Sequence, residues 1–188
     1  MTAGWPAALR TLAFLFARAP STEHLNRLRD SRELASILGR DPWEADAEQS
    51  AQELADTLAD EYTRLFVGPY RHFPPQEGLA RGDGELMGGH ALAVRAAYER
   101  ARYSAEPEVG LPFDHLAVEL DFAASLLDDG DVPAAASFVQ EHLLAWVPAW
   151  VEAFAGQARH PFYPALGRAL CDCLHELATV AARERAAR

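Results

Sequence analysis

Residues 51–68 read AQELADTLADEYTRLFVG, with an apolar side chain at every third or fourth position. This spacing puts the apolar side chains on one face of an α-helix, whereas a strand would need them at every second position. Gly68 and Pro69 then end the periodic pattern. We therefore predict a helix from about residue 46 to residue 66, with an apolar face formed by Ala47, Ala51, Leu54, Leu58, Tyr62, Leu65 and Phe66.

The rest of the chain has the same helical character, because Ala and Leu abound and no alternating segment is long enough for a strand. We expect an all-α fold, a single compact helical domain over residues 1–188, with the loop at 67–84 as the one possible internal boundary. Pro148 is expected to kink or split the helix that contains it. The other helices are expected at about residues 6–18, 21–38, 85–102, 114–127, 134–155 and 163–185.

The charge balance limits the possible partners. The chain carries 28 acidic residues against 17 basic ones, all of them Arg, for a net charge of −11. The absence of Lys excludes Schiff-base and P-loop lysine chemistry. A strongly negative chain disfavours nucleic acid, whose phosphates need neutralising, and favours a basic partner through long-range attraction. Solubility alone also explains the acidic surface.

Cysteine usage and the N-terminal sequence bear on location. Two cysteines, Cys171 and Cys173, exclude a disulfide scaffold. Together with His175 they do not share one helix face, so we interpret them as core residues rather than metal ligands. The start lacks a basic region, and the apolar run at 12–17 is far too short to span a bilayer. We therefore expect a cytoplasmic protein without membrane insertion.

Two clusters near the middle of the chain are candidates for a binding site. The first cluster, Tyr62, Leu65 and Phe66, lies on one face at a helix end and suits either the core or a half-wet groove. The second cluster is Pro74-Pro75-Gln76-Glu77. Its prolines stiffen a loop and lower the entropy lost on binding, and Glu77 offers a carboxylate. A rigid solvent loop is an equally good interpretation of the second cluster.

The third cluster covers residues 112–119, which read PFDHLAVE. Asp114 is expected to cap the helix that follows, which by itself explains the residue. His115 would then lie in the first turn, where the helix dipole disfavours imidazolium and Glu119 favours it. Asp114, His115 and Glu119 together are expected to form an acidic rim that accepts guanidinium donors.

The three clusters, in this order and at these separations, resemble the TorD/DmsD/NarJ family of chaperones for molybdenum-cofactor oxidoreductases. The resemblance runs from about Ala51 to Leu170 and implies the all-α fold of that family. It implies a non-enzymatic protein without a cofactor or metal, either a monomer or a domain-swapped dimer. Such a chaperone holds the apo catalytic subunit and its twin-arginine signal peptide, and delays export until the cofactor is inserted. The peptide-binding residues that the resemblance implies are Tyr62, Leu65, Phe66, Pro75, Glu77, Asp114, His115 and Glu119.

The sequence departs from the family pattern at two positions of the second cluster. Gln76 stands where the family has an aromatic residue, and Gly78 stands where it has Ser. The family pattern therefore predicts a weaker apolar contact at Gln76, and it leaves the identity of the client open.

Three alternatives remain at this level. A chaperone of the same fold could serve a cytoplasmic molybdoenzyme without an export signal. A helical hydrolase could use Asp114 and His115, although no Ser or Cys lies in a recognisable nucleophile elbow. A metal shared by His115 and Glu119 would need further ligands, and none has an obvious spacing. The third alternative is a purely structural helical interaction protein.

Overall fold

The computed structural model describes residues 4–31, 33–39, 41, 43–68, 72–84, 87–104 and 110–186. Over these residues the secondary structure is helical, apart from one isolated β-bridge, and the all-α prediction is confirmed. Short 3₁₀ and π segments occupy Glu44–Asp46, Thr63–Val67 and Val139–Leu143. The α-helices are α1 (Trp5–Ala17), α2 (Thr22–Asp30), α3 (Glu33–Leu38), α4 (Ala51–Tyr62), α5 (Glu77–Ala80), α6 (Gly89–Ala101), α7 (Leu116–Asp128), α8 (Val132–Phe138), α9 (Leu144–Ala155) and α10 (Phe162–Ala186).

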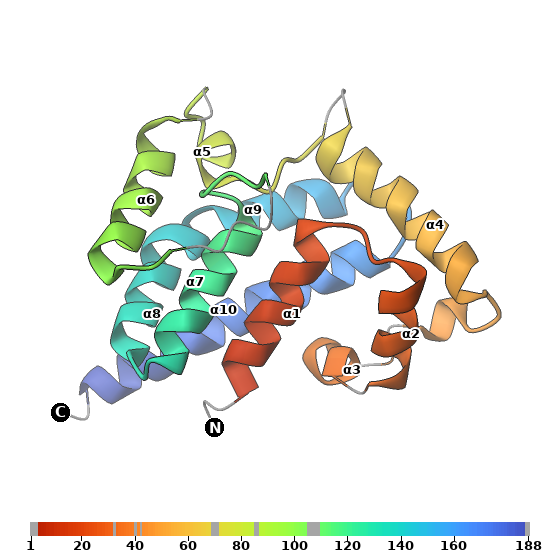
Figure 1. The fold of residues 1–188 in the computed structure, drawn as a ribbon, viewed down its shortest axis with the longest axis horizontal. Coiled ribbons are helices and arrows are strands. Elements are labelled where there is room, and N and C mark those ends of the chain that lie inside the picture. The colour runs from red at the N-terminus through yellow and green to blue at the C-terminus, as the bar shows by residue number, and fades with distance from the viewer. Residues whose placement is uncertain are drawn as a thin grey trace.

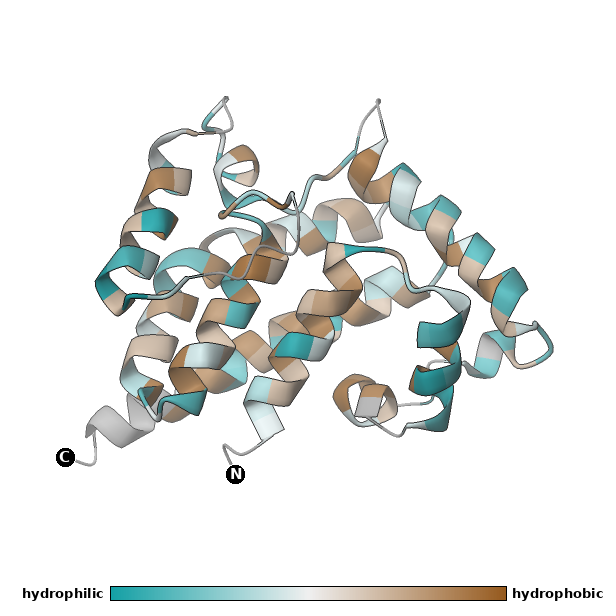
Figure 2. Cartoon of the chain, in the orientation of Figure 1, coloured by the Kyte–Doolittle hydropathy of each residue, from teal (hydrophilic) through white to brown (hydrophobic). Residues whose placement is uncertain are grey.

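The long helix α10 runs behind the other helices for most of the length of the molecule (Figure 1). In front of it, α1 and α7 lie side by side and make the most extensive helix pair, while α8 and α9 pack on α10 itself. The polar helices α2 and α4 lie at one end (Figure 2), and α5 and α6 lie at the other (Figure 1). The segment that follows α4 crosses the molecule toward α5 and carries the second cluster.

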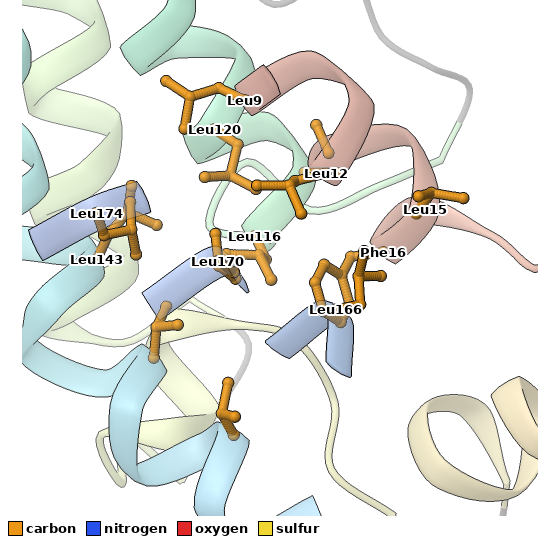
Figure 3. Packing of buried hydrophobic residues seen from close by; sticks show 14 of the residues in the cluster. Leu9, Leu12, Leu15, Phe16, Leu116, Leu120, Leu143, Leu166, Leu170 and Leu174 are labelled. Atoms are coloured by element: carbon orange, nitrogen blue, oxygen red, sulfur yellow. The ribbon is translucent and has the colours of Figure 1, made fainter. Parts of the chain in front are cut away.

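Apolar stripes on α1, α7 and α10 form the centre of the core, and Figure 3 shows their side chains facing one another. Removing each leucine side chain fully from water contributes roughly 1.5–3 kcal/mol to folding. The core also includes residues that precede segment 67–84, such as Leu54 and Leu58, and the prediction that this segment is one loop is wrong, because it contains α5. The labelled residues in Figure 3 are Leu9, Leu12, Leu15, Phe16, Leu116, Leu120, Leu143, Leu166, Leu170 and Leu174.

Several predicted helix boundaries are wrong, and local capping explains two of them. The helix expected at 21–38 is two helices, because Ser31 is extended and its N–H donates to the Arg27 carbonyl. The helix expected from residue 46 starts instead after Ser50, which forms a reciprocal capping box with Glu53. The apolar periodicity continues upstream of this cap, so the predicted start of the helix lies too far toward the N-terminus.

The helix expected at 134–155 is interrupted, but not at Pro148. Pro148 lies inside α9, and the interruption is the π segment Val139–Leu143 immediately upstream.

The helix expected at 85–102 begins at Gly89, and the predicted start at residue 85 lies outside the described residues. Within the described part of the chain, none of the helices has the length and apolar character needed to cross a bilayer.

Candidate functional site

The second and third clusters, far apart in sequence, are joined by their backbones. The Glu77 N–H donates to the Asp114 carbonyl at 2.9 Å, and the Leu116 N–H donates to the Pro75 carbonyl at 2.8 Å. Both bonds join main-chain groups. Every residue has these groups, apart from proline, which lacks the N–H. The pairing therefore fixes the loop before α5 against the start of α7.

The residues that face each other in this pairing are Gln76 and His115, which form the isolated antiparallel bridge. His115 caps α7, because its Nδ1 accepts the N–H of Ala117 at 3.1 Å. The prediction that Asp114 caps this helix is wrong, since Asp114 Oδ2 instead accepts the N–H of Gly78 at 3.1 Å. Burial lowers the pKa of His115 to about 4, so the imidazole is neutral at physiological pH.

The space around Gly78 is too narrow for a side chain without a shift of its neighbours. A Cβ added there would lie 2.9 Å from Asp83 Oδ2 and 3.0 Å from Asp114 Oδ2. Asp83 cannot easily withdraw, because it accepts the N–H of His90 at 3.0 Å and bonds the ring Nδ1 of His90 at 2.6 Å. Two carboxyl groups thus converge on the position where the family pattern places Ser, and a side chain there would have to displace at least one of them.

Three carboxyl groups lie buried beneath the paired clusters. Glu77 and Glu119 are 0% exposed and Asp114 is 3% exposed, so the expectation of an acidic rim at the surface is wrong. Glu77 forms an ion pair with Arg81, one helical turn away, and its other oxygen lies 3.0 Å from His142 Nδ1. We call Glu77, Asp114 and Glu119 the acidic cluster.

Glu119 is the least satisfied member of the acidic cluster. Its carboxyl oxygens lie near the indole N–H of Trp146, but the geometry falls short of a hydrogen bond, and neither group has another partner among the described residues. Burial raises the pKa of Glu119 well above its ordinary value, and the charges of Glu77 and Asp114 add to the rise. Trp146 and Arg81 act in the opposite direction without cancelling it. Burial also raises the pKa of Asp114. Asp114 and Glu119 therefore lose their protons at a higher pH than exposed carboxyls do.

The first cluster is buried as well, with Leu65 at 0% exposure and Phe66 at 3%. The Tyr62 hydroxyl donates to the carbonyl of Phe16 at 3.0 Å, and the Phe66 ring packs edge-on against neighbouring rings. The sequence allowed either a core position or a groove for this cluster, and the structure places it in the core.

The first cluster nevertheless reaches the second through Phe73. The Phe73 N–H donates to the carbonyl of Leu65 at 2.6 Å, and the Phe73 carbonyl accepts the indole N–H of Trp150 at 3.0 Å. Both bonds hold the residue immediately before the Pro74-Pro75 pair. The first cluster and α9 therefore set the position of the second cluster from below.

Partly exposed and mostly apolar residues flank the paired segments, and we call them the surface of the site. Gln76 lies among these residues, and its side-chain Oε1 is buried without a hydrogen-bond partner. An acceptor that lacks a partner costs free energy that an incoming donor recovers. The other partly exposed residues of this surface are Phe73, Pro74, Leu111, Pro112 and Phe113.

Sequence reasoning missed three polar residues of this site. Arg81 was detectable, because it follows Glu77 by four residues, the spacing of an ion pair on a helix. Asp83 caps α6 from a loop, and His142 reaches Glu77 from the π segment before α9. No local pattern marks the contacts of Asp83 and His142, because their partners come from other elements.

Comparisons with known proteins bear on this site. The family described as nitrate reductase delta subunit matches residues 18–152. The chain is 30% identical to the Tat proofreading chaperone DmsD of Salmonella typhi over 172 residues, which cover 85% of this chain and 81% of the relative. It is 28% identical to the chaperone protein TorD of Vibrio cholerae serotype O1 over 127 residues, 55% of this chain and 53% of that relative. A match of this extent shows the family: the chain belongs to the TorD/DmsD/NarJ family and is a chaperone rather than an enzyme.

Proposed function

We propose that this chaperone acts in the cytoplasm on a molybdenum-cofactor oxidoreductase. It would bind the apo catalytic subunit and its twin-arginine signal peptide, and delay export until the cofactor is inserted. The name of the relative DmsD, a Tat proofreading chaperone, supports a proofreading role, and that of TorD supports a chaperone role. The observation that carries the site assignment is the buried, unpartnered acceptor Gln76 Oε1 at the paired clusters, together with the buried carboxyl of Glu119.

The apolar part of the signal peptide would lie on the partly exposed surface around Phe73, Pro74 and Phe113. Its guanidinium groups would be attracted by the acidic cluster underneath, since charges act strongly through a medium of low dielectric constant. Burial raises the pKa of both Asp114 and Glu119 when no client is bound, and an approaching guanidinium would lower it again. The negative charge of the site would therefore increase when a client binds.

Access to the acidic cluster requires the loop that carries the second cluster to move. The loop is held to the third cluster by few backbone hydrogen bonds, and the turn after α5 contains Gly82 and Gly84, both at positive φ. Within this proposal, the contact residues are Pro75, Glu77, Asp114 and Glu119, whereas His115 orients α7. The roles of Tyr62, Leu65 and Phe66 are indirect, through their support of Phe73.

Calorimetric titration with the twin-arginine signal peptide of a molybdoenzyme from the same genome tests the proposal, with a paired-lysine peptide as ligand control. Asp114→Asn keeps an acceptor for the Gly78 N–H but removes the charge. We expect this variant to bind about tenfold more weakly, because a charge-assisted bond is lost. Its melting temperature should stay near that of the parent.

The matched control is Asp128→Asn, at the exposed far end of α7, which should bind like the parent. Equal affinity of parent and Asp114→Asn would remove Asp114 from the site. Binding of the apo subunit without any binding of its signal peptide would favour the alternative chaperone, one whose client carries no export signal.

A further inference from the structure

Arg81 places a guanidinium of the chain itself on the acidic cluster. Its Nη1 donates to Glu77 Oε1, while Glu77 Oε2 lies 3.0 Å from His142 Nδ1, so both oxygens of this fully buried carboxyl are engaged. The charge of Arg81 also acts on Glu119. Among the described residues, Arg81 is the only arginine that pairs with a member of the cluster. A guanidinium from outside can reach Glu77 only if Arg81 leaves.

Arg81 is the member of this ion pair that borders water. Its side chain is 29% exposed, whereas that of Glu77 is 0% exposed. The first N–H groups of α5, those of Glu77 and Gly78, are both held by Asp114, and the next residue after Arg81 is Gly82 at positive φ. The carboxyl therefore lies at the anchored end of α5, and the guanidinium lies at the end that opens into a glycine turn.

An exchange of guanidinium groups on Glu77 is close to balanced. Removal of Arg81 without a replacement would leave a buried carboxylate with His142 alone, which is unfavourable. A client arginine restores the same planar, charge-assisted contact. The internal arginine has the advantage of being attached to the chain, so it loses no translational freedom when it binds. Occupation of the site by Arg81 therefore lowers the apparent affinity for a client.

We propose that Arg81 stands in for one arginine of the client and leaves Glu77 when the client binds. The other client arginine would meet Asp114 and Glu119, which form no ion pair with any described residue. Arg81 is then a specificity-determining residue, because a ligand must bring its own guanidinium to replace it, and an ammonium lacks the planar fork. The inference rests on the proposed function, since it concerns the group that competes for the same site.

The test is the calorimetric titration of the full-length Arg81→Ala variant with the twin-arginine signal peptide. We expect this variant to bind about tenfold more tightly than the parent, because no internal guanidinium has to be displaced. A peptide with glutamine in place of both arginines should gain nothing from the substitution. The matched control is Arg95→Ala, which removes the same charge from an ion pair of the same spacing on α6 and should bind like the parent.

A second variant and a small probe keep the test independent of folding. Arg81→Lys retains a counter-charge beside Glu77, and we expect it to bind the peptide more tightly than the parent but less tightly than Arg81→Ala, because an ammonium competes less well than a guanidinium. Ethylguanidinium chloride should raise the melting temperature of Arg81→Ala and return its peptide affinity toward the parental value. Ethylammonium chloride, at the same ionic strength, should do neither.

Parental or weaker peptide binding by both Arg81 variants would overturn the inference, and binding by the parent would at the same time leave the proposed function intact. Binding by the variants without binding by the parent would support the inference, as the result of complete occupation by Arg81. Failure of the parent and of both variants to bind the peptide would overturn the proposed function and this inference together.

Discussion

Glu119→Gln tests how the ionisation of Glu119 affects the free energy of unfolding. Glutamine has the shape of a protonated glutamate but no proton to lose. In the parent, burial raises the pKa of Glu119 well above the value of 4.5 that it has in an unfolded chain. Above about pH 4.5 the folded state therefore keeps a proton that the unfolded state has already released. The free energy of unfolding must then fall as the pH rises, and the variant lacks this contribution.

For one proton, the free energy of unfolding can change by at most about 1.4 kcal/mol per pH unit. Between pH 5 and pH 7, the variant can therefore gain up to about 2.5 kcal/mol relative to the parent, if the proton stays in the folded protein over the whole range. The other titrating groups around Glu119, including Asp114 and Glu77, are present in both proteins. Their contributions largely cancel in the difference between variant and parent.

Urea unfolding followed by tryptophan fluorescence at pH 5, 6, 7 and 8 measures this difference directly. Glu152→Gln, an exposed change on α9, is the matched control and should run parallel to the parent at every pH. A variant curve for Glu119→Gln that also runs parallel to the parent would falsify the claim that the folded protein retains this proton.

Two further substitutions test the packing around the site. Tyr62→Phe removes the hydrogen bond to the Phe16 carbonyl and should lower the free energy of unfolding by about 1 kcal/mol. In a circular dichroism melt this loss lowers the melting temperature by roughly 2–4 °C. An unchanged melting temperature would contradict the hydrogen bond. Gly78→Ala forces a methyl group against two carboxylates and should cost roughly 1–3 kcal/mol in urea unfolding, whereas Gly89→Ala, with open space at its Cβ, should be neutral or stabilising. Equal stability of the two alanine variants would argue against the steric role of Gly78.

Helical faces could be predicted because they depend on local spacing. Leu54, Leu58 and Leu65, which the periodicity of residues 51–68 assigns to an apolar face, are all fully buried. The cap of α7 could not be predicted in the same way. Asp114 is a good capping residue, but its carboxylate is engaged by a backbone N–H from Gly78, and His115 takes the capping position instead.

The location of the candidate site was predictable, but its burial was not. The motifs that resemble the family do meet in space, through the backbone bonds between the second and third clusters. Whether Glu77 faces water or the interior depends on Arg81, which directly follows α5, and on His142, which lies in the segment before α9. A carboxylate with such partners tolerates burial, whereas an isolated one would remain at the surface.

Because the second and third clusters are paired through main-chain atoms, their side chains can change without changing how the two segments are held together. Pro75 contributes its carbonyl, the one hydrogen-bonding group that its backbone retains, and the bridge across Gln76 involves no particular side chain. A replacement at Gln76 can therefore alter what the surface prefers to hold while the loop stays in register with α7. Under the proposed function, one substitution at Gln76 would change which client is preferred without disturbing the fold.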